Sequence, residues 1–173
     1  HARLGNFDKV LQNLETIDKI IQIPLKEMRL MIFELQPFQL EQKGLQVMLR
    51  ERLQRVEERA GINTQIVFNE EIKFPLSSQF ELYRVAQEAL NNSLKHASAT
   101  SMTIRMARHK HQILFEIIDN GLGFDISSLT QTTGDGVNNM QERSKLINGD
   151  FSIQSQPGNG TTVRVTFEEN IHD

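Results

Sequence analysis

The chain has 173 residues, 38% of them hydrophobic and 24% charged, which suffices for a folded domain with its own core. Its net charge of −3 provides no basic surface and argues against nucleic-acid binding. The sequence has no apolar run of about 18 residues, so we expect no membrane contact by this part of the protein. The lack of cysteine excludes thiolate metal sites and is typical of a reducing, cytoplasmic setting.

The first predicted element is a long amphipathic helix over Phe7–Leu35. Apolar residues recur there every seven positions, at Phe7, Leu14, Ile21, Met28 and Leu35. Pro24 predicts a kink, and Pro37 ends the pattern. The helix could pack on its own domain, but about 30 residues is long for a helix inside a small globule. The pattern therefore favours a dimerisation helix, and the start at His1-Ala2-Arg3 suggests a piece of a longer protein.

The rest of the chain mixes helices with strands, without a repeating strand–helix–strand rhythm. We predict helices over residues 40–60, 78–96 and 137–148, and strands over residues 62–69, 101–108, 112–119, 150–155 and 161–168. Ser77 or Ser78 would cap the second of these helices, with Glu81 completing a capping box. This arrangement predicts an α+β fold, a two-layer sandwich of sheet and helices.

The first polar segment lies on the helix over residues 78–96. Glu88, Asn92 and Lys95 are spaced by four and three residues, so they share one helix face. A carboxylate, an amide and an ammonium on one stripe suit a hydrated Mg²⁺ ion with phosphates. From spacing alone, a solvated helix face with a Glu–Lys pair is the stronger interpretation.

The second polar segment, Asp119-Asn120-Gly121-Leu122-Gly123-Phe124-Asp125, directly follows a predicted strand. Gly121 and Gly123 allow a sharp turn and a close approach of the backbone to a ligand. Asp119, at the strand end, can accept a hydrogen bond from an exocyclic amine such as that of adenine. The alternative is an Asn-Gly hairpin turn.

Two further glycine segments follow. Gly134-Asp135-Gly136-Val137 opens a helix, where free N–H groups and the helix dipole favour a phosphate; the alternative is a flexible loop. Gly158-Asn159-Gly160-Thr161-Thr162 places hydroxyl groups at a strand start, and its alternative is a plain β-turn.

Taken in order, these segments resemble the ATPase domain of two-component sensor histidine kinases in the GHKL superfamily. Residues 82–97 (LYRVAQEALNNSLKHA) are similar to the N box of the branch that partners LuxR/NarL-type response regulators. Residues 119–125 and 134–137, with Met140, Glu142 and Arg143, are similar to its two glycine boxes, and residues 158–161 to its closing turn. Residues 24–29 and 34–37 resemble the second helix of its dimerisation and phosphotransfer bundle.

The resemblance implies the Bergerat fold, a mixed sheet covered by helices and preceded by one long helix, with ATP and Mg²⁺ as cofactors. It divides the chain into part of the bundle over residues 1–37 and the ATPase domain over residues 38–173. It also implies a homodimer through the bundle and a LuxR/NarL-type response regulator as partner, in a cytoplasmic protein or the cytoplasmic part of a membrane-anchored sensor.

Residue by residue, the resemblance implies that Asn92 and Glu88 coordinate or orient Mg²⁺, with Lys95 and His96 facing the phosphates. Asp119 would bind the adenine amine, with Thr161 supporting it through water. The remaining nucleotide-binding positions would shape the pocket floor or close a lid over residues 126–133; they are Gly121, Gly123, Gly134, Gly136 and Val137.

One departure concerns the phosphoacceptor. The family's acceptor histidine precedes an acidic residue on the first bundle helix, whereas the only such pair here is His172-Asp173. We therefore expect the acceptor helix to be missing from this sequence. His109 and His111 fall in a predicted turn, where exposure is the favoured interpretation. The alternatives are a non-catalytic nucleotide-binding adaptor, an anti-sigma serine kinase, and an ATP-driven machine of the Hsp90 or MutL kind.

Overall fold

The structure, a computed structural model, describes residues 21, 38–69, 72, 74–128 and 135–168. The chain forms two compact units, residues 1–39 and residues 40–173. The helix predicted over Phe7–Leu35, including Pro24, lies outside the described residues except for Ile21, which is helical. Among the described helices, none is long and apolar enough to cross a membrane. The second unit contains all the polar and glycine segments of the predicted site.

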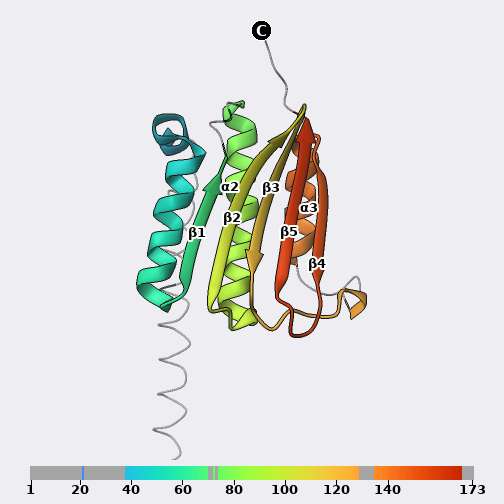
Figure 1. Ribbon diagram of the computed structural model, residues 1–173. Helices are drawn as coiled ribbons and strands as arrows, with labels where there is room; N and C mark the ends of the chain where they lie inside the picture. The colour runs from blue at the N-terminus through green and yellow to red at the C-terminus, as the bar shows by residue number, and fades with distance from the viewer. Residues whose placement is uncertain (1–20, 22–37, 70–71, 73, 129–134, 169–173) are drawn as a thin grey trace, which may run out of the picture. The chain divides into compact units, whose positions relative to one another are not determined.

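A five-stranded mixed sheet forms one layer of this unit (Figure 1). The strands are β1 (Asn63–Phe68), β2 (Ser101–His109), β3 (Gln112–Asp119), β4 (Asp150–Ser155) and β5 (Thr161–Glu168). Their order is β1-β2-β3-β5-β4, in which β1 and β2 are parallel and every other neighbouring pair is antiparallel. The predicted mixed sheet is confirmed, and β4 and β5 have the predicted bounds.

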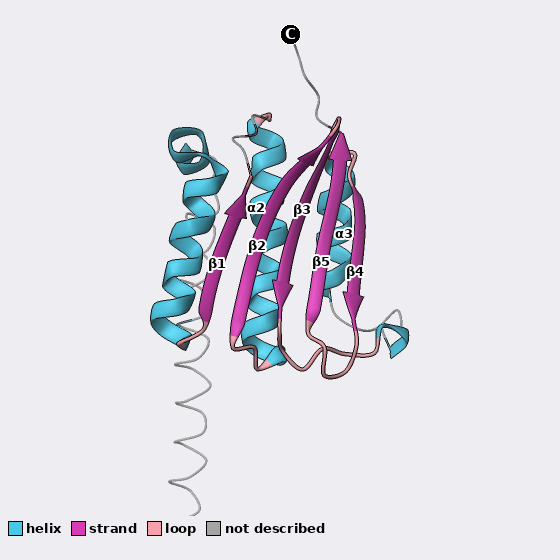
Figure 2. Ribbon diagram, viewed as in Figure 1, coloured by secondary structure: helices cyan, strands magenta, loops and turns pink. Residues whose placement is uncertain are grey.

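Helices form the second layer. Residues 38–60 are helical, and they are followed in the chain by α2 (Leu76–Asn92) and α3 (Asp135–Leu146). Figure 2 shows α2 and α3 side by side behind the sheet. The core between the layers holds fully buried side chains from each of these helices, β2 and β3; they include Leu49, Leu82, Ile104, Phe115 and Met140. The predicted α+β two-layer sandwich is confirmed.

The start of α2 differs from the prediction. The residue that caps α2 is Pro75, and it makes no side-chain capping hydrogen bond, so the proposed cap at Ser77 or Ser78 is wrong. Gln79 ties this end of the helix instead. Its Nε2 donates to the Phe74 carbonyl at 3.0 Å, and its Oε1 accepts from Leu45 N at 3.0 Å. A tertiary contact therefore replaces the local cap that the Ser-x-x-Glu spacing suggested.

The end of α2 positions the residues of the first polar segment. A π-helical turn, η1 (Ser93–Ala97), continues α2, and Ser98 ends it in the left-handed conformation with φ of 48°. The predicted extent to His96 is thus nearly right, but the periodicity changes at Ser93. Single π-helical turns occur frequently at functional sites.

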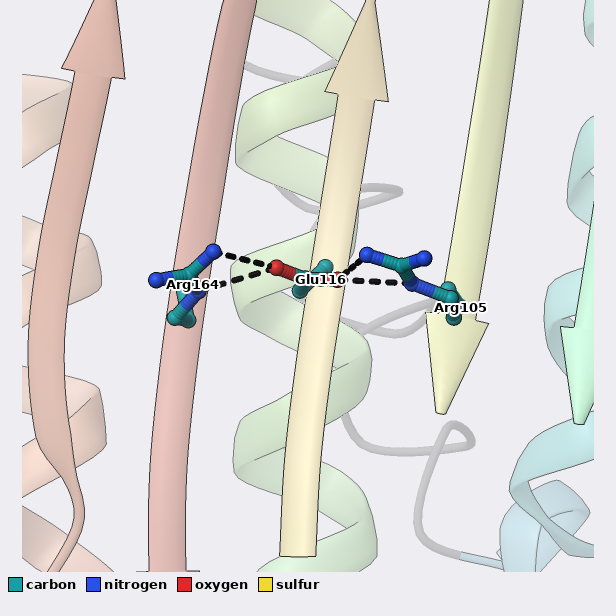
Figure 3. A network of polar contacts seen from close by, with 3 residues as sticks. All are labelled: Arg105, Glu116 and Arg164. Atoms are coloured by element: carbon teal, nitrogen blue, oxygen red, sulfur yellow. Dashed lines mark hydrogen bonds and ion pairs between the residues drawn. The ribbon is translucent and has the colours of Figure 1, made fainter. Parts of the chain in front are cut away.

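On the face of the sheet away from α2, Glu116 lies between two arginines (Figure 3). Its side chain is 1% exposed. Arg105 donates to Glu116 Oε2 from Nε at 2.7 Å and also from Nη2, and Arg164 donates to Oε1 from Nε at 2.8 Å. Burial raises the pKa of Glu116, but the hydrogen bonds and charges of the two arginines outweigh it and place the pKa below its ordinary value. The network joins β2, β3 and β5 across the sheet.

Candidate functional site

A cavity of about 390 Å³ is lined by residues of α2, η1 and α3 and of β3, β4 and β5, near the strand ends that lie lowest in Figure 1. Apolar side chains make most of its wall; they are Ala89, Ala97, Ile117, Phe124, Val137, Met140, Ile153 and Val163. Its polar lining is sparse and consists of Asn92, Ser93, His96, Asp119 and Thr161, with Gly123 completing the lining. An apolar pocket with a few convergent polar groups is typical of a small-molecule site.

Asp119 provides the buried charge of this cavity, at the last position of β3 and only 8% exposed. Ser93 Oγ donates to Asp119 Oδ2 at 2.6 Å, and Gly121 N donates to Oδ1 at 2.9 Å. Each carboxylate oxygen therefore has one protein donor and a further lone pair to offer. The carboxylate is held in one orientation and can accept hydrogen bonds from a ligand.

The turn after Asp119 packs tightly against two other segments. Leu122 N donates to the Ala97 carbonyl at 2.7 Å, and Gly158 N donates to the Leu122 carbonyl at 2.6 Å. A Cβ on Gly121 would lie 2.4 Å from Ala97 O, and one on Gly123, where φ is 59°, would lie 2.1 Å from Gln156 O. Only glycine fits either position. The hairpin alternative is wrong, because β3 pairs with β2 and β5 and not with the chain that follows this turn.

Ser155, at the end of β4, joins three segments at the cavity floor. Its Oγ accepts from Phe124 N at 2.9 Å and donates to the Gly160 carbonyl at 2.9 Å. The same oxygen lies 3.0 Å from Thr161 Oγ1. Ser155 and Thr161 are opposite one another in the β4–β5 pair, and Thr161 and Asp119 are opposite in the β3–β5 pair. The three side chains thus form a row across neighbouring strand ends.

The first turn of α3 contacts the polar face of α2. A Cβ on Gly136 would lie 2.4 Å from Glu88 Oε1 and 3.2 Å from Asn92 Nδ2. The free N–H groups and the positive end of the helix dipole lie at this start of α3. Glu88 and Asn92 are therefore placed beside a helix end that favours anions.

A second contact between α2 and α3 lies farther along both helices. Arg143 Nη1 donates to Glu81 Oε2 at 2.8 Å, with side chains 28% and 15% exposed. The pKa of Arg84 is lowered, mainly by burial and to a lesser extent by the positive charge of Arg143. The Glu81–Arg143 pair fixes how α3 lies on α2 and hence where its first turn meets Asn92.

The segment predicted as a lid, Ile126–Thr133, is described only for Ile126–Ser128, which form the short 3-10 turn η2. Asp125 Oδ1 accepts from Ser127 Oγ at 2.8 Å and from Ser127 N at 2.9 Å. These two hydrogen bonds lower the pKa of Asp125. Gly134 lies outside the described residues.

Residues 77–171 match the family of histidine kinase-, DNA gyrase B- and HSP90-like ATPases. The chain belongs to this family. A sensor-like histidine kinase of Chloroflexus aurantiacus is 36% identical over 91% of this chain and 28% of its own length. The sensor protein VraS of Staphylococcus saprophyticus is 31% identical over 94% of this chain and 46% of its own length. The chain thus spans less than half the length of these curated relatives.

Solved histidine kinases share the fold. The histidine kinase AdeS of Acinetobacter baumannii aligns with a TM-score of 0.62 at 13% identity, over 84% of this chain and 80% of that one. The histidine kinase domain of the Erythrobacter litoralis blue-light activated kinase aligns with a TM-score of 0.59 at 15% identity, over 69% and 57%. The Bergerat fold inferred from the sequence is confirmed, and an ATPase domain of this family implies ATP binding.

The ATPase domain brings six of the predicted site residues to the cavity. Asn92, His96, Asp119, Gly123, Val137 and Thr161 line it. Glu88, Lys95, Gly121 and Gly136 are not among the lining residues, although Glu88 and Gly136 meet beside it. Lys95 and His96 are both exposed, and no ion pair joins Lys95 to Glu88, both of which the structure describes.

Sequence reasoning missed Ser93 and Ser155, which hold Asp119 and Thr161. Apart from Val137, it also missed the apolar walls. Part of these walls could have been predicted, because side chains two residues apart in a strand lie on the same face of the sheet. Three wall residues are two positions from a polar residue of the site: Ile117 from Asp119, Ile153 from Ser155 and Val163 from Thr161.

The ATPase domain offers few protein ligands for a metal ion. Within the described ranges, no group of three or more His, Cys, Asp or Glu side chains could hold one, and His109 and His111 are exposed as predicted. Mg²⁺ needs no such cage, because it binds through one or two protein oxygens, substrate phosphates and water. The amide of Asn92 and the carboxylate of Glu88 fit that requirement.

Proposed function

We propose that this chain is the catalytic domain of a two-component sensor histidine kinase. It would hold Mg²⁺-ATP for transfer of the γ-phosphate to a histidine elsewhere in the whole protein, for relay to a LuxR/NarL-type response regulator. The observation that carries the proposal is the fixed Asp119 carboxylate at the floor of an apolar cavity, with Asn92 and the start of α3 nearby.

The apolar part of the cavity suits a purine base. Walls such as Ile117, Met140 and Val163 exclude water from a flat ring, and burial of that ring supplies binding free energy. Asp119 would accept from the adenine amine, with Thr161 accepting through water. Gly121 and Gly123 keep the turn close enough for this contact, since a side chain at either position would displace it.

The region between Asn92 and α3 suits the phosphates. Asn92 and Glu88 would hold a Mg²⁺ ion that neutralises phosphate charge, and Glu88 would also orient water. Lys95 and His96 would face the phosphates, and Gly134 and Gly136 would allow the chain before α3 to close over them. These groups contribute by positioning and charge neutralisation, which account for most enzymatic phosphoryl transfer.

The whole protein would be a homodimer through a helical bundle to which residues 1–37 belong, with residues 38–173 as the ATPase domain. The similarity to the sensor protein VraS covers 94% of this chain and so extends into residues 1–37, which supports their origin in a sensor protein. The N box over residues 82–97 supports the LuxR/NarL-partnering branch. The domain would work on the cytoplasmic side of the cell.

Isothermal titration calorimetry tests nucleotide binding. We expect the chain to bind ATP more tightly with Mg²⁺ than with EDTA, and Asn92→Ala to abolish that difference while the protein stays folded. Asn91→Ala is the matched control, since the Asn91 side chain accepts a hydrogen bond from Arg52 and is not among the residues that line the cavity. No heat with ATP and Mg²⁺ from a folded sample would contradict the proposal.

Phosphoryl transfer separates a kinase from a nucleotide-binding adaptor. With γ-labelled ATP we expect no acid-labile label on this chain alone, and label on a polypeptide that carries the acceptor helix when it is added in trans. A chain that binds Mg²⁺-ATP but labels no added acceptor helix would be an adaptor.

A further inference from the structure

The sequence contains three asparagines that directly precede glycine: Asn120, Asn148 and Asn159. In such a pair the glycine N can attack the side-chain amide carbon of the asparagine, because glycine has no side chain to obstruct the approach. A new C–N bond closes a succinimide ring, the bond from that carbon to the amide nitrogen breaks, and ammonia leaves. Water then opens the ring to aspartate or isoaspartate. The attack requires a glycine N–H that is free to turn toward the asparagine and to lose its proton.

The pair at Asn120 is held against this reaction. Gly121 N donates to Asp119 Oδ1 at 2.9 Å, a hydrogen bond to a buried carboxylate. The Asn120 amide is also fixed, because its Oδ1 accepts from Thr100 N at 2.9 Å and from Ser101 N at 2.8 Å. Attack at this pair would have to break hydrogen bonds of both the glycine and the asparagine.

The pair at Asn148 is exposed, but its glycine is held as well. Asn148 lies in the turn between α3 and β4, and its side chain is open to solvent. Gly149 N donates to the Ser144 carbonyl at 2.9 Å. Exposure of the asparagine is therefore not sufficient here, since the N–H that must attack is committed to another acceptor.

The pair at Asn159 lacks this protection. Asn159 is exposed, and its Nδ2 lies 3.4 Å from Gln156 Oε1, which is long for a hydrogen bond. Among the described residues, no hydrogen bond involves Gly160 N. Gly160 is itself buried, but the group that it would attack is the neighbouring side chain and not a dissolved reagent. The third pair thus combines an exposed amide with an uncommitted glycine N–H.

We propose that Asn159 is a site of spontaneous deamidation in the folded chain, with isoaspartate as the main product. Isoaspartate adds one methylene to the main chain and a negative charge to the turn. Both neighbours of Asn159 are anchored: Gly158 N donates to the Leu122 carbonyl at 2.6 Å, and the Gly160 carbonyl accepts from Ser155 Oγ at 2.9 Å. The longer main chain must therefore displace one of these contacts, which lie at the cavity floor.

Peptide mapping by mass spectrometry measures the rate at each pair. The folded chain is incubated at mildly alkaline pH and digested with trypsin, which places Asn148 and Asn159 in the peptide of residues 146–164 and Asn120 in that of residues 111–143. Fragmentation then locates each product. We expect conversion at Asn159 to be about five-fold or more faster than at Asn148, where one hydrogen bond must break, and slowest conversion at Asn120.

The same measurement in urea tests whether the fold sets this order. The three pairs share the reacting residues, so their rates should converge once the hydrogen bonds are lost. Conversion at Asn148 or Asn120 as fast as at Asn159 in the folded chain would overturn the inference. The same order persisting in urea would also overturn it, because the order would then come from the sequence and not from the hydrogen bonds.

Asn159→Gln is the matched variant, because glutamine would need a larger ring and reacts far more slowly. After equal incubation, wild type should carry isoaspartate and bind ATP more weakly than Asn159→Gln in calorimetry; this consequence rests on the proposed function. Equal affinity, with isoaspartate present at Asn159, would overturn the effect on the cavity. Fresh wild type that binds no ATP would instead contradict the proposed function, and the order of the three deamidation rates would still decide the modification.

Discussion

Replacing Glu116 with glutamine tests the arginine–carboxylate network on the open face of the sheet. Glutamine keeps the size of the side chain but removes the charge that Arg105 and Arg164 share. Removing one partner of a fully buried ion pair costs about 3–5 kcal/mol, whereas an exposed pair contributes about 0.2–1 kcal/mol. Glu116 is 1% exposed but its arginines are 47% and 37% exposed. We therefore expect Glu116→Gln to lower the free energy of unfolding by about 2 kcal/mol at pH 7.

The same substitution should show a defined pH dependence. The arginines hold the pKa of Glu116 below its ordinary value of 4.5 in the folded state. The carboxylate therefore stabilises the fold above pH 4.5, and this stabilisation is lost as pH falls through the lower, folded-state pKa. Because glutamine does not titrate, the difference between wild type and Glu116→Gln should shrink as the solution is acidified below pH 4.5.

Urea denaturation followed by circular dichroism measures both effects. Glu142→Gln is the control, because Glu142 is 69% exposed and pairs with the exposed Lys145, so its loss should cost less than about 0.5 kcal/mol. A Glu116→Gln variant as stable as Glu142→Gln at pH 7, or a difference from wild type that does not change on acidification, would refute the reasoning.

Two further substitutions test how the site is positioned. Gly123→Ala places a Cβ 2.1 Å from the Gln156 carbonyl at a φ of 59°, so we expect loss of ATP binding in calorimetry. Gly158→Ala is the control for backbone strain alone, because Gly158 also has a positive φ, of 83°, but no atom lies within 4 Å of the added Cβ, and it should bind ATP more tightly than Gly123→Ala. Binding by Gly123→Ala as tight as by Gly158→Ala would show that the turn can relax. Arg143→Met breaks the contact to Glu81 and should lower the melting temperature by several degrees, equivalent to about 1 kcal/mol. Unchanged melting would show that the pair does not hold α3 on α2.

The sequence alone was sufficient to predict those strands and turns that have strong local signals. The strands β3, β4 and β5, which flank short turns, were predicted with the bounds that the structure gives, and glycines marked the turn at Gly121 and Gly123. Asp119 could be singled out because it ends a predicted strand directly before a glycine turn. These features depend on neighbours in the chain, which a sequence displays directly.

Other features depend on contacts between distant segments. The change from α-helix to a π-helical turn after Asn92 is one such feature, which helical spacing alone could not predict. The start of α2 depends on Gln79 bridging to Leu45, and Gly136 meets Glu88 across two helices. The hydrogen bonds of Ser155 require the end of β4, the start of β5 and the turn after β3 to lie together. No local pattern encodes these contacts.

Binding of ATP to wild type and to Asp119→Asn, measured by calorimetry with Mg²⁺, tests the central claim most directly. Asparagine keeps the shape but removes the charge and turns one acceptor into a donor that faces the base amine. We predict binding by wild type and a loss of about thirty-fold or more, roughly 2 kcal/mol, in the folded variant. Equal affinity of the two proteins for ATP would contradict the claim that Asp119 is the group that recognises the base.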